Sequence, residues 1–305
     1  MRITQKVSEI LQNYSCENSG LKTNLARILM SGKLAGTGKM VILPVDQGFE
    51  HGPERTFAKN PDSYDPHYHF NLALNAGLSA YAAPLGALEC GADVFAGSVP
   101  LILKINSSNS LSSKDLSPSQ AITSSVKDAL RLGCSAIGMT IYPGSNGFNE
   151  CVSNLKEIIN EAKSYGIVIV VWSYPRGEGI SKQGETALDV VSYAAHMAAL
   201  IGAHIIKVKP PINFIEGVEA QKAMEGMKTD TLSDRISIIK RSCFNGRRLV
   251  IFSGGAAKSD SEMLSEINAI NLGGGDGSII GRNAFQRNNS DAMNLLENII
   301  EIYKK

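Results

Sequence analysis

Short apolar runs rich in β-branched residues recur along the chain, and each ends in polar residues, glycine or proline. This pattern predicts eight strands, over residues 40–45, 78–82, 101–105, 136–141, 167–172, 204–208, 249–252 and 277–280. Between most of them the apolar residues recur three or four positions apart. That spacing predicts helices, including residues 121–132, 149–165, 186–200 and 259–270. Repeated strand–helix alternation favours an α/β fold with a parallel sheet closed into a (β/α)8 TIM barrel.

Two segments lie outside a minimal barrel. Residues 1–39 show helical spacing before the first strand, so we expect an N-terminal helical extension that covers the barrel's amino-terminal end or meets a neighbouring subunit. Residues 40–305 then form the barrel domain. Residues 213–245 are long for one helix, which indicates a helical insertion near the pocket or a mobile segment. A doubly wound open sheet is the alternative, but no G-x-G-x-x-G motif follows the first strand.

Composition narrows the class of partner. The chain of 305 residues has 30 lysines and arginines against 29 acidic residues, and no basic run is present. We therefore expect no nucleic acid and no anionic membrane surface as a main partner. The five cysteines are dispersed and include no C-x-x-C pair. The sequence also contains neither an apolar stretch of membrane-spanning length nor a signal-peptide pattern, so we expect a cytoplasmic protein.

Alternation along the strands decides which side chains meet inside a barrel. Lys207 and Lys209 share one face of a strand and follow a buried run. A lysine in such a place either pairs with a charge or is held neutral, as an amine nucleophile that forms a Schiff base with a carbonyl. Alternation does not distinguish the two lysines, and a structural ion pair is an equally good interpretation of Lys207.

Other chemically capable side chains fall at the same end of the barrel. Trp172 and Tyr174 share a strand face, and Asp46 continues the first strand. At the carboxyl-terminal mouth these side chains would meet the lysines. Tyr174 could instead be a rim aromatic residue, Asp46 a turn residue, and Lys104 a second buried lysine that pairs with Asp46.

Glycine-bearing loops follow the last two predicted strands. Ser253-Gly254-Gly255 comes after the seventh strand and Gly281-Arg282 after the eighth. These two loops are the usual phosphate site of a barrel, because glycine lets backbone N–H groups approach an anion and arginine binds phosphate bidentately. The alternative is a tight turn at Gly254-Gly255.

Histidines offer the other candidate chemistry. Glu50-His51 and His67-Tyr68-His69 contain metal-ligand residue types. Neither an H-E-x-x-H motif nor a Cys/His cluster accompanies them, so we interpret these histidines as solvated loop residues and expect no metal. The glycine-rich segment at residues 32–40 has the wrong spacing for a P-loop and precedes a strand.

Five segments in this order resemble the archaeal-type class I fructose-1,6-bisphosphate aldolases, a family also found in bacteria. They are LPVDQG at 43–48, VWSYPR at 171–176, IKVK at 206–209, SGG at 253–255 and GRN at 281–283, and the resemblance runs from about residue 34 to the end of the chain. It implies a TIM barrel and a lyase that reversibly cleaves fructose 1,6-bisphosphate to dihydroxyacetone phosphate and glyceraldehyde 3-phosphate, in glycolysis and gluconeogenesis. It also implies a homo-oligomer that needs no cofactor.

The resemblance also assigns roles that alternation left open. Lys207 matches the Schiff-base lysine, Tyr174 the general acid and base, Trp172 a wall of the active site and Asp46 a polar residue beside the substrate. The phosphate-binding positions of the family correspond to Ser253, Gly254, Gly255, Gly281 and Arg282. Residues 213–245 do not align with the compact archaeal pattern, so the contacts of the second phosphate stay unassigned.

Three rival functions remain. Related Schiff-base barrels include a thiolase that acts on a phosphorylated diketone and a heptulosonate synthase, and both share the lysine and the phosphate loops. A zinc-dependent aldolase would need a histidine cluster. A non-catalytic, phosphate-binding barrel would keep the loops but would have no use for Lys207 and Tyr174 together.

Overall fold

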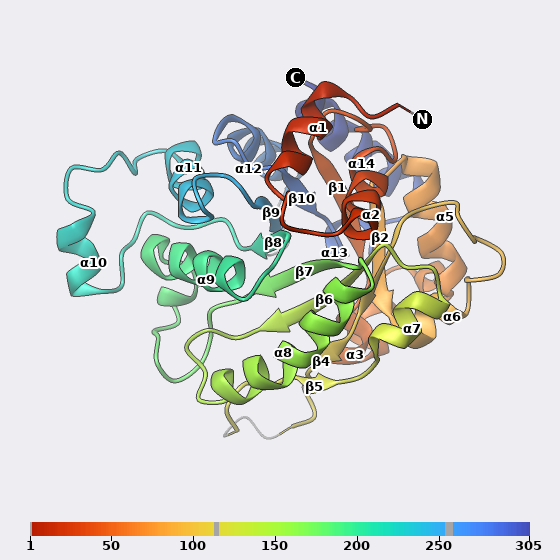
Figure 1. Ribbon diagram of the computed structural model, residues 1–305, viewed down its shortest axis with the longest axis horizontal. Coiled ribbons are helices and arrows are strands. Elements are labelled where there is room, and N and C mark those ends of the chain that lie inside the picture. Colours follow the sequence, from red (N-terminus) through yellow and green to blue (C-terminus); the bar gives the residue numbers. More distant parts are fainter. Residues whose placement is uncertain (1, 113–115, 254–258) are drawn as a thin grey trace.

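Eight parallel strands form a closed barrel in the computed structural model, which describes residues 2–112, 116–253 and 259–305 (Figure 1). The order around the barrel is β1, β10, β9, β8, β7, β6, β3 and β2. These strands are β1 (Met40–Pro44), β2 (Ala80–Pro84), β3 (Leu101–Lys104), β6 (Ala136–Ile141), β7 (Val168–Ser173), β8 (Ile205–Val208), β9 (Leu249–Ser253) and β10 (Gly277–Ile279). All eight predicted strands are present, and the TIM-barrel prediction is confirmed.

The described helices surround the strands, and most of them cover the outside of the barrel (Figure 1). They are α1 (Gln5–Gln12), α2 (Ser19–Leu29), α3 (Gln47–His51), α4 (Pro53–Phe57), α5 (Pro66–Ala76), α6 (Leu85–Glu89), α7 (Val126–Arg131), α8 (Phe148–Ser164), α9 (Leu188–Leu200), α10 (Val218–Ala223), α11 (Leu232–Ser242), α12 (Asp260–Leu272), α13 (Arg282–Phe285) and α14 (Asn289–Lys304). Short 3₁₀ turns lie at Pro61–Tyr64 and Gly184–Thr186. Across the described residues, no helix combines the length and the apolarity needed to span a bilayer.

One predicted helix begins too early. Residues 121–132 were expected to be helical, but Ala121–Ile122 form strand β5, which pairs antiparallel with β4 (Asn106–Ser107). The helix starts at Val126 because Ser125 caps it: the Ser125 hydroxyl accepts from the backbone of Asp128, whose carboxylate accepts from the backbone of Ser125. The first residues of that segment therefore belong to a two-stranded hairpin after β3.

Side-chain alternation along the strands separates two apolar cores. Ile42, Val170 and Ile205 pack inside the barrel, while their sequence neighbours pack between the barrel and the helices. The interior also accommodates Trp172, which is 1% exposed. Gly138 on the neighbouring β6 makes this possible, since a Cβ there would lie 2.1 Å from the indole ring. The predicted inward faces are thus the observed ones.

Helices α1 and α2 pack with the interior core at the amino-terminal end of the barrel. Tyr14, in the segment that joins them, donates a hydrogen bond to the His204 carbonyl before β8 (2.8 Å) and accepts one from the Leu249 amide of β9 (3.3 Å). This end of the barrel is therefore covered, which leaves the carboxyl-terminal mouth for a ligand. The division into residues 1–39 and 40–305 stays a prediction.

The segment at 213–245 divides into two parts. Helix α11 is the regular barrel helix between β8 and β9, whereas α10 lies farther out on an excursion of the chain (Figure 1). Pro211, Ile212 and Asn213, which lead into the excursion, line the cavity at the barrel mouth together with Leu232 and Arg235 of α11. The segment therefore contains an inserted helix, α10, but the cavity is lined by the residues before this helix and by α11, not by α10 itself.

Candidate active site

A cavity of about 800 Å³ opens at the carboxyl-terminal mouth of the barrel. It brings together seven of the nine site residues predicted from the sequence, namely Asp46, Trp172, Tyr174, Lys207, Ser253, Gly281 and Arg282. Gly254 and Gly255 lie outside the described residues. The strand ends therefore converge as the alternation predicted, and the roles of these residues stay predictions.

Lys207 lies deep in this cavity. It is 5% exposed, and its Nζ is 5.1 Å from the centre of the Tyr174 ring and 5.5 Å from that of Trp172. Burial lowers the pKa of Lys207 to about 7, partly opposed by the charge of Asp46 and assisted by that of Lys104. Because only the unprotonated amine attacks a carbonyl, a substantial fraction of Lys207 is nucleophilic at neutral pH.

The two other candidate lysines have carboxylate partners. Lys209 lies one residue beyond β8, and its Nζ is 3.3 Å from Glu185 at the rim of the cavity. Lys104 is buried, 3.8 Å from Asp46, and donates to the Asn106 carbonyl, so the predicted Lys104–Asp46 pair is present. Among the described residues, no carboxylate lies within ion-pair distance of Lys207. The geometry thus favours Lys207 over both as the nucleophile.

Tyr174 is placed to carry protons beside that amine. Burial raises the pKa of Tyr174 well above its usual value, the charges of Asp46 and Glu50 raise it further, and a hydrogen bond with Ser253 opposes the rise. The phenol therefore stays protonated near neutral pH and acts as a hydrogen-bond donor. The chain places it just beyond β7, next to β8 in the barrel.

The described part of the predicted phosphate site lines the same cavity, at the ends of β9 and β10. Gly281 follows β10, where a Cβ would lie 2.9 Å from the Pro44 carbonyl oxygen. Glycine is therefore needed for the ends of β1 and β10 to approach each other. Arg282 and Ser253 then line the same cavity, and an arginine here can bind a phosphate through two parallel hydrogen bonds.

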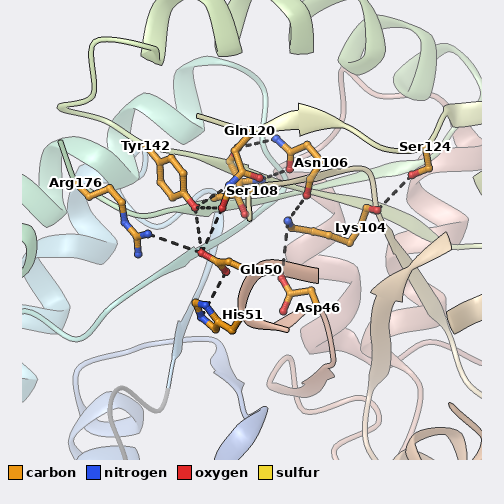
Figure 2. Close-up of polar contacts among 11 residues, drawn as sticks. Asp46, Glu50, His51, Lys104, Asn106, Ser108, Gln120, Ser124, Tyr142 and Arg176 are labelled. Carbon is orange, nitrogen blue, oxygen red and sulfur yellow. Dashed lines mark hydrogen bonds and ion pairs between the residues drawn. The ribbon is translucent and has the colours of Figure 1, made fainter. Parts of the chain in front are cut away.

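Sequence reasoning missed a group of polar residues that gathers around the carboxylate of Glu50, which also lines the cavity (Figure 2). It accepts hydrogen bonds from Tyr142 (3.3 Å) and Ser108 (3.5 Å), and Arg176 lies 3.8 Å away. Tyr142 follows β6 directly, and Arg176 is the third residue after the end of β7. Their place just after a strand was the signal that could have revealed them.

The solvated-loop interpretation is wrong for all three histidines. His67 lies in α5, where its Nε2 is 2.8 Å from the Cys90 carbonyl. His51 ends α3 and lines the cavity. His69 is buried in α5, where its Nε2 is 2.8 Å from the Ser63 carbonyl and burial lowers its pKa to about 4. The apolar residues that follow His69 in its helix were the sequence signal for this burial. Within the described ranges, no three His, Cys, Asp or Glu side chains are arranged to hold a metal ion.

Known proteins share both the sequence and the fold. The chain is 35% identical to a probable class 1 fructose-bisphosphate aldolase of Chlamydia muridarum, over 95% of this chain and 86% of that one. It is 34% identical to a class 1 fructose-bisphosphate aldolase of Thermoproteus tenax, over 88% of this chain and 90% of the other. The crystal structure of an archaeal fructose 1,6-bisphosphate aldolase superposes with a TM-score of 0.77 and 33% identity, covering 93% of this chain and 100% of the other.

A further solved archaeal aldolase, with its catalytic lysine covalently bound to a carbinolamine intermediate, superposes with a TM-score of 0.76 and 32% identity over 93% of this chain. The sequence model of the DeoC/LacD family aldolases matches residues 40–287, which include the whole barrel. With the closed barrel and the lysine at its mouth, these similarities show that the chain belongs to the DeoC/LacD family of aldolases.

Proposed function

We propose that this protein is a class I fructose-bisphosphate aldolase, which reversibly cleaves fructose 1,6-bisphosphate through a Schiff base on Lys207. One observation carries the proposal: a buried lysine amine with a pKa of about 7 faces a tyrosine in the same cavity as Arg282. That combination supplies a nucleophile, a proton carrier and a phosphate ligand. The relatives of similar length that bear this name support the same activity.

The reaction follows from these positions. The Lys207 amine adds to the ketone carbon, and the resulting carbinolamine loses water to give an iminium ion. The C3–C4 bond then breaks, its electrons move to the iminium to form an enamine, and the C4 hydroxyl loses its proton as the aldehyde forms. The hydroxide released as the carbinolamine loses water takes the phenol proton of Tyr174, and the resulting phenolate accepts the C4 hydroxyl proton and later delivers it to the enamine carbon. Water finally hydrolyses the iminium, releasing dihydroxyacetone phosphate.

The direct test is a cleavage assay with fructose 1,6-bisphosphate, measuring both triose phosphates. We expect turnover that persists in EDTA and is irreversibly lost when borohydride is added with the substrate. Inhibition by EDTA would instead favour the zinc-dependent type of aldolase. Faster turnover of a phosphorylated diketone with a thiol acceptor, or of heptulosonate precursors, would favour the related Schiff-base enzymes.

Arg282→Ala should weaken binding of phosphorylated substrates. A charge-assisted hydrogen bond contributes about 1.5–3 kcal/mol, so KM for fructose 1,6-bisphosphate should rise about 10- to 100-fold. Binding of an unphosphorylated ketone such as dihydroxyacetone should change little. Equal losses for both ligands would show that Arg282 supports the structure and does not bind phosphate.

Trp172 should report on ligand binding through its fluorescence. It is the only tryptophan, it lines the cavity, and its buried indole N–H has no hydrogen-bond partner among the described residues. Dihydroxyacetone phosphate should change its emission saturably, and the change should shrink in Arg282→Ala at the same ligand concentration. Inorganic phosphate should have a smaller effect, because it cannot form the imine.

An unchanged emission at saturating ligand, while borohydride traps the imine, would contradict this role for Trp172.

The assembly and location of the protein are part of the proposal as well. We propose a homo-oligomer in the cytoplasm, and light scattering coupled to size-exclusion chromatography measures the subunit number.

A further inference from the structure

A second lysine, Lys104, is buried near the mouth of the barrel, and neither the predicted roles nor the reaction on Lys207 includes it. Lys104 ends β3, is 3% exposed and is not among the described residues that line the active-site cavity. Its Nζ is 5.9 Å from the centre of the Trp172 ring, and the Nζ of Lys207 is 5.5 Å from the same centre. Two lysine amines therefore lie around one indole, and of these two only Lys207 reaches the cavity.

The Lys104 amine is held in place by the neighbouring strands. It donates a hydrogen bond to the Asn106 carbonyl (Figure 2). The Asn106 side chain in turn donates to the Thr140 carbonyl of β6 (2.8 Å) and accepts from the Thr140 amide (2.7 Å). All three residues are buried. Because a buried amine has lost its water, these contacts and the nearby charges decide whether it keeps its proton.

Asp46 supplies one carboxylate for the two amines. It lies two residues after β1, lines the active-site cavity and is 3.8 Å from the Lys104 Nζ (Figure 2). Among the described residues, Asp46 is the only carboxylate within ion-pair distance of Lys104, and Lys207 has none. Burial lowers the pKa of both lysines, and the charge of Asp46 opposes this effect in each. Asp46 therefore stabilises a proton on either amine, and in this structure it pairs with Lys104.

The other charged or titratable groups around the two amines do not alter this pairing. Glu50 of α3 also opposes the effect of burial on both amines, but it is not within ion-pair distance of either. Arg282 of α13 lowers the pKa of the nucleophilic amine further. Cys151 of α8 lies near Lys104, and burial raises the pKa of its thiol, so it is uncharged at pH 7. Tyr174 likewise stays protonated.

We propose that Lys104 is a positioning residue for the nucleophile: it keeps Asp46 as its own ion-pair partner and so leaves Lys207 a neutral amine. This inference rests on the proposed function. Lys104 offers a proton both an ion pair and a hydrogen bond to a carbonyl, whereas Lys207 offers it no ion pair. Once Lys104 carries the charge, its repulsion adds to burial in lowering the pKa of Lys207.

The pH dependence of imine formation tests this division of charge. Lys104→Met removes the ammonium and frees Asp46 to pair with Lys207, which should then hold its proton to a higher pH. With dihydroxyacetone phosphate and cyanoborohydride, the pH of half-maximal adduct formation should rise by about one unit or more, so the rate at pH 7 should fall about fivefold or more. The rate should recover as the pH rises, which a merely structural role would not produce.

Two further variants sharpen the test. Lys104→Gln can still donate to the Asn106 carbonyl but has no charge, so it should shift the profile in the same direction. It takes the place of Lys104→Met if circular dichroism shows that the latter does not fold. Lys209→Met is the matched control, because it removes a lysine of the cavity that pairs with Glu185, and its profile should match that of the wild type.

An unchanged half-maximal pH in a folded, uncharged variant overturns the inference, even if its rate is lower at every pH. A wild-type half-maximal pH of about 10, the value of an ordinary lysine, overturns it whatever the variants do. Labelling of Lys207 with acetic anhydride, followed by peptide mapping at each pH, should give the same values without any sugar. If wild-type protein neither forms the adduct nor cleaves fructose 1,6-bisphosphate, the proposed function fails, and the labelling still decides the role of Lys104.

Discussion

Lys207→Met should lower the aldolase rate by about four orders of magnitude or more, because it removes the group that forms the covalent intermediate. Methionine has similar length and removes the charge, and the site is already buried, so the fold should persist. In wild-type protein, borohydride with dihydroxyacetone phosphate should add the mass of the reduced adduct to the peptide that contains Lys207. The variant should acquire no such adduct.

Lys209→Met is the matched control, since Lys209 shares the strand face of Lys207 but pairs with Glu185 at the rim. It should retain trapping at Lys207. An adduct on Lys209 or Lys104 in the wild-type protein, or an adduct that survives in Lys207→Met, would reject the assignment. Circular dichroism of each variant separates a loss of chemistry from a loss of fold.

Tyr174→Phe should slow turnover by about 100-fold or more, the usual contribution of a positioned acid–base group. The ring would still pack beside Lys207, so imine formation should remain possible and borohydride should still trap dihydroxyacetone phosphate. Steady-state cleavage rates and the trapped fraction, measured on the same sample, distinguish the two steps. The effect should appear mainly in kcat.

Tyr193→Phe is the matched control, because Tyr193 is an exposed tyrosine of α9 away from the active-site cavity. Near-normal turnover of Tyr174→Phe would reject proton transfer by its hydroxyl. A variant that can no longer be trapped would show that Tyr174 is needed earlier, when the carbinolamine loses water.

The barrel could be predicted from the sequence because most of its strands are nearly continuous apolar runs that end abruptly. Strand Val168–Ser173 illustrates this. It is buried along its whole length, and the side chains of Tyr174 and Arg176, which come after it, each end in a polar group. Boundaries were less certain where capping decides them. Ser125 ends one extended segment and starts a helix, a choice that periodicity does not contain.

The site was predicted where strand alternation or glycine-bearing loops mark it, and it was missed around Glu50. Alternation placed Trp172 and Lys207 inside, but it could not separate Lys207 from Lys209, because both share a face. Depth separates them, since β8 ends at Val208. Glu50, Tyr142 and Ser108 come from three distant segments, and only closure of the barrel brings them together.

The pairing of the first barrel strand with the last has a consequence for how this chain is made. Met40 pairs with Gly277, 237 positions later, and Tyr14 bonds to segments 190 and 235 positions away. At a synthesis rate of roughly 5–20 residues per second, β10 appears roughly 10–50 seconds after β1. Throughout that interval one edge of β1, an entirely apolar strand, has no partner.

An unpaired apolar edge is a template for association with other chains. The barrel cannot close by local steps, because its closing contacts are among the most distant in the sequence, and such contacts form slowly. Before residue 279 has been made, β1 and β10 cannot pair, so the barrel cannot close until nearly the whole chain is present.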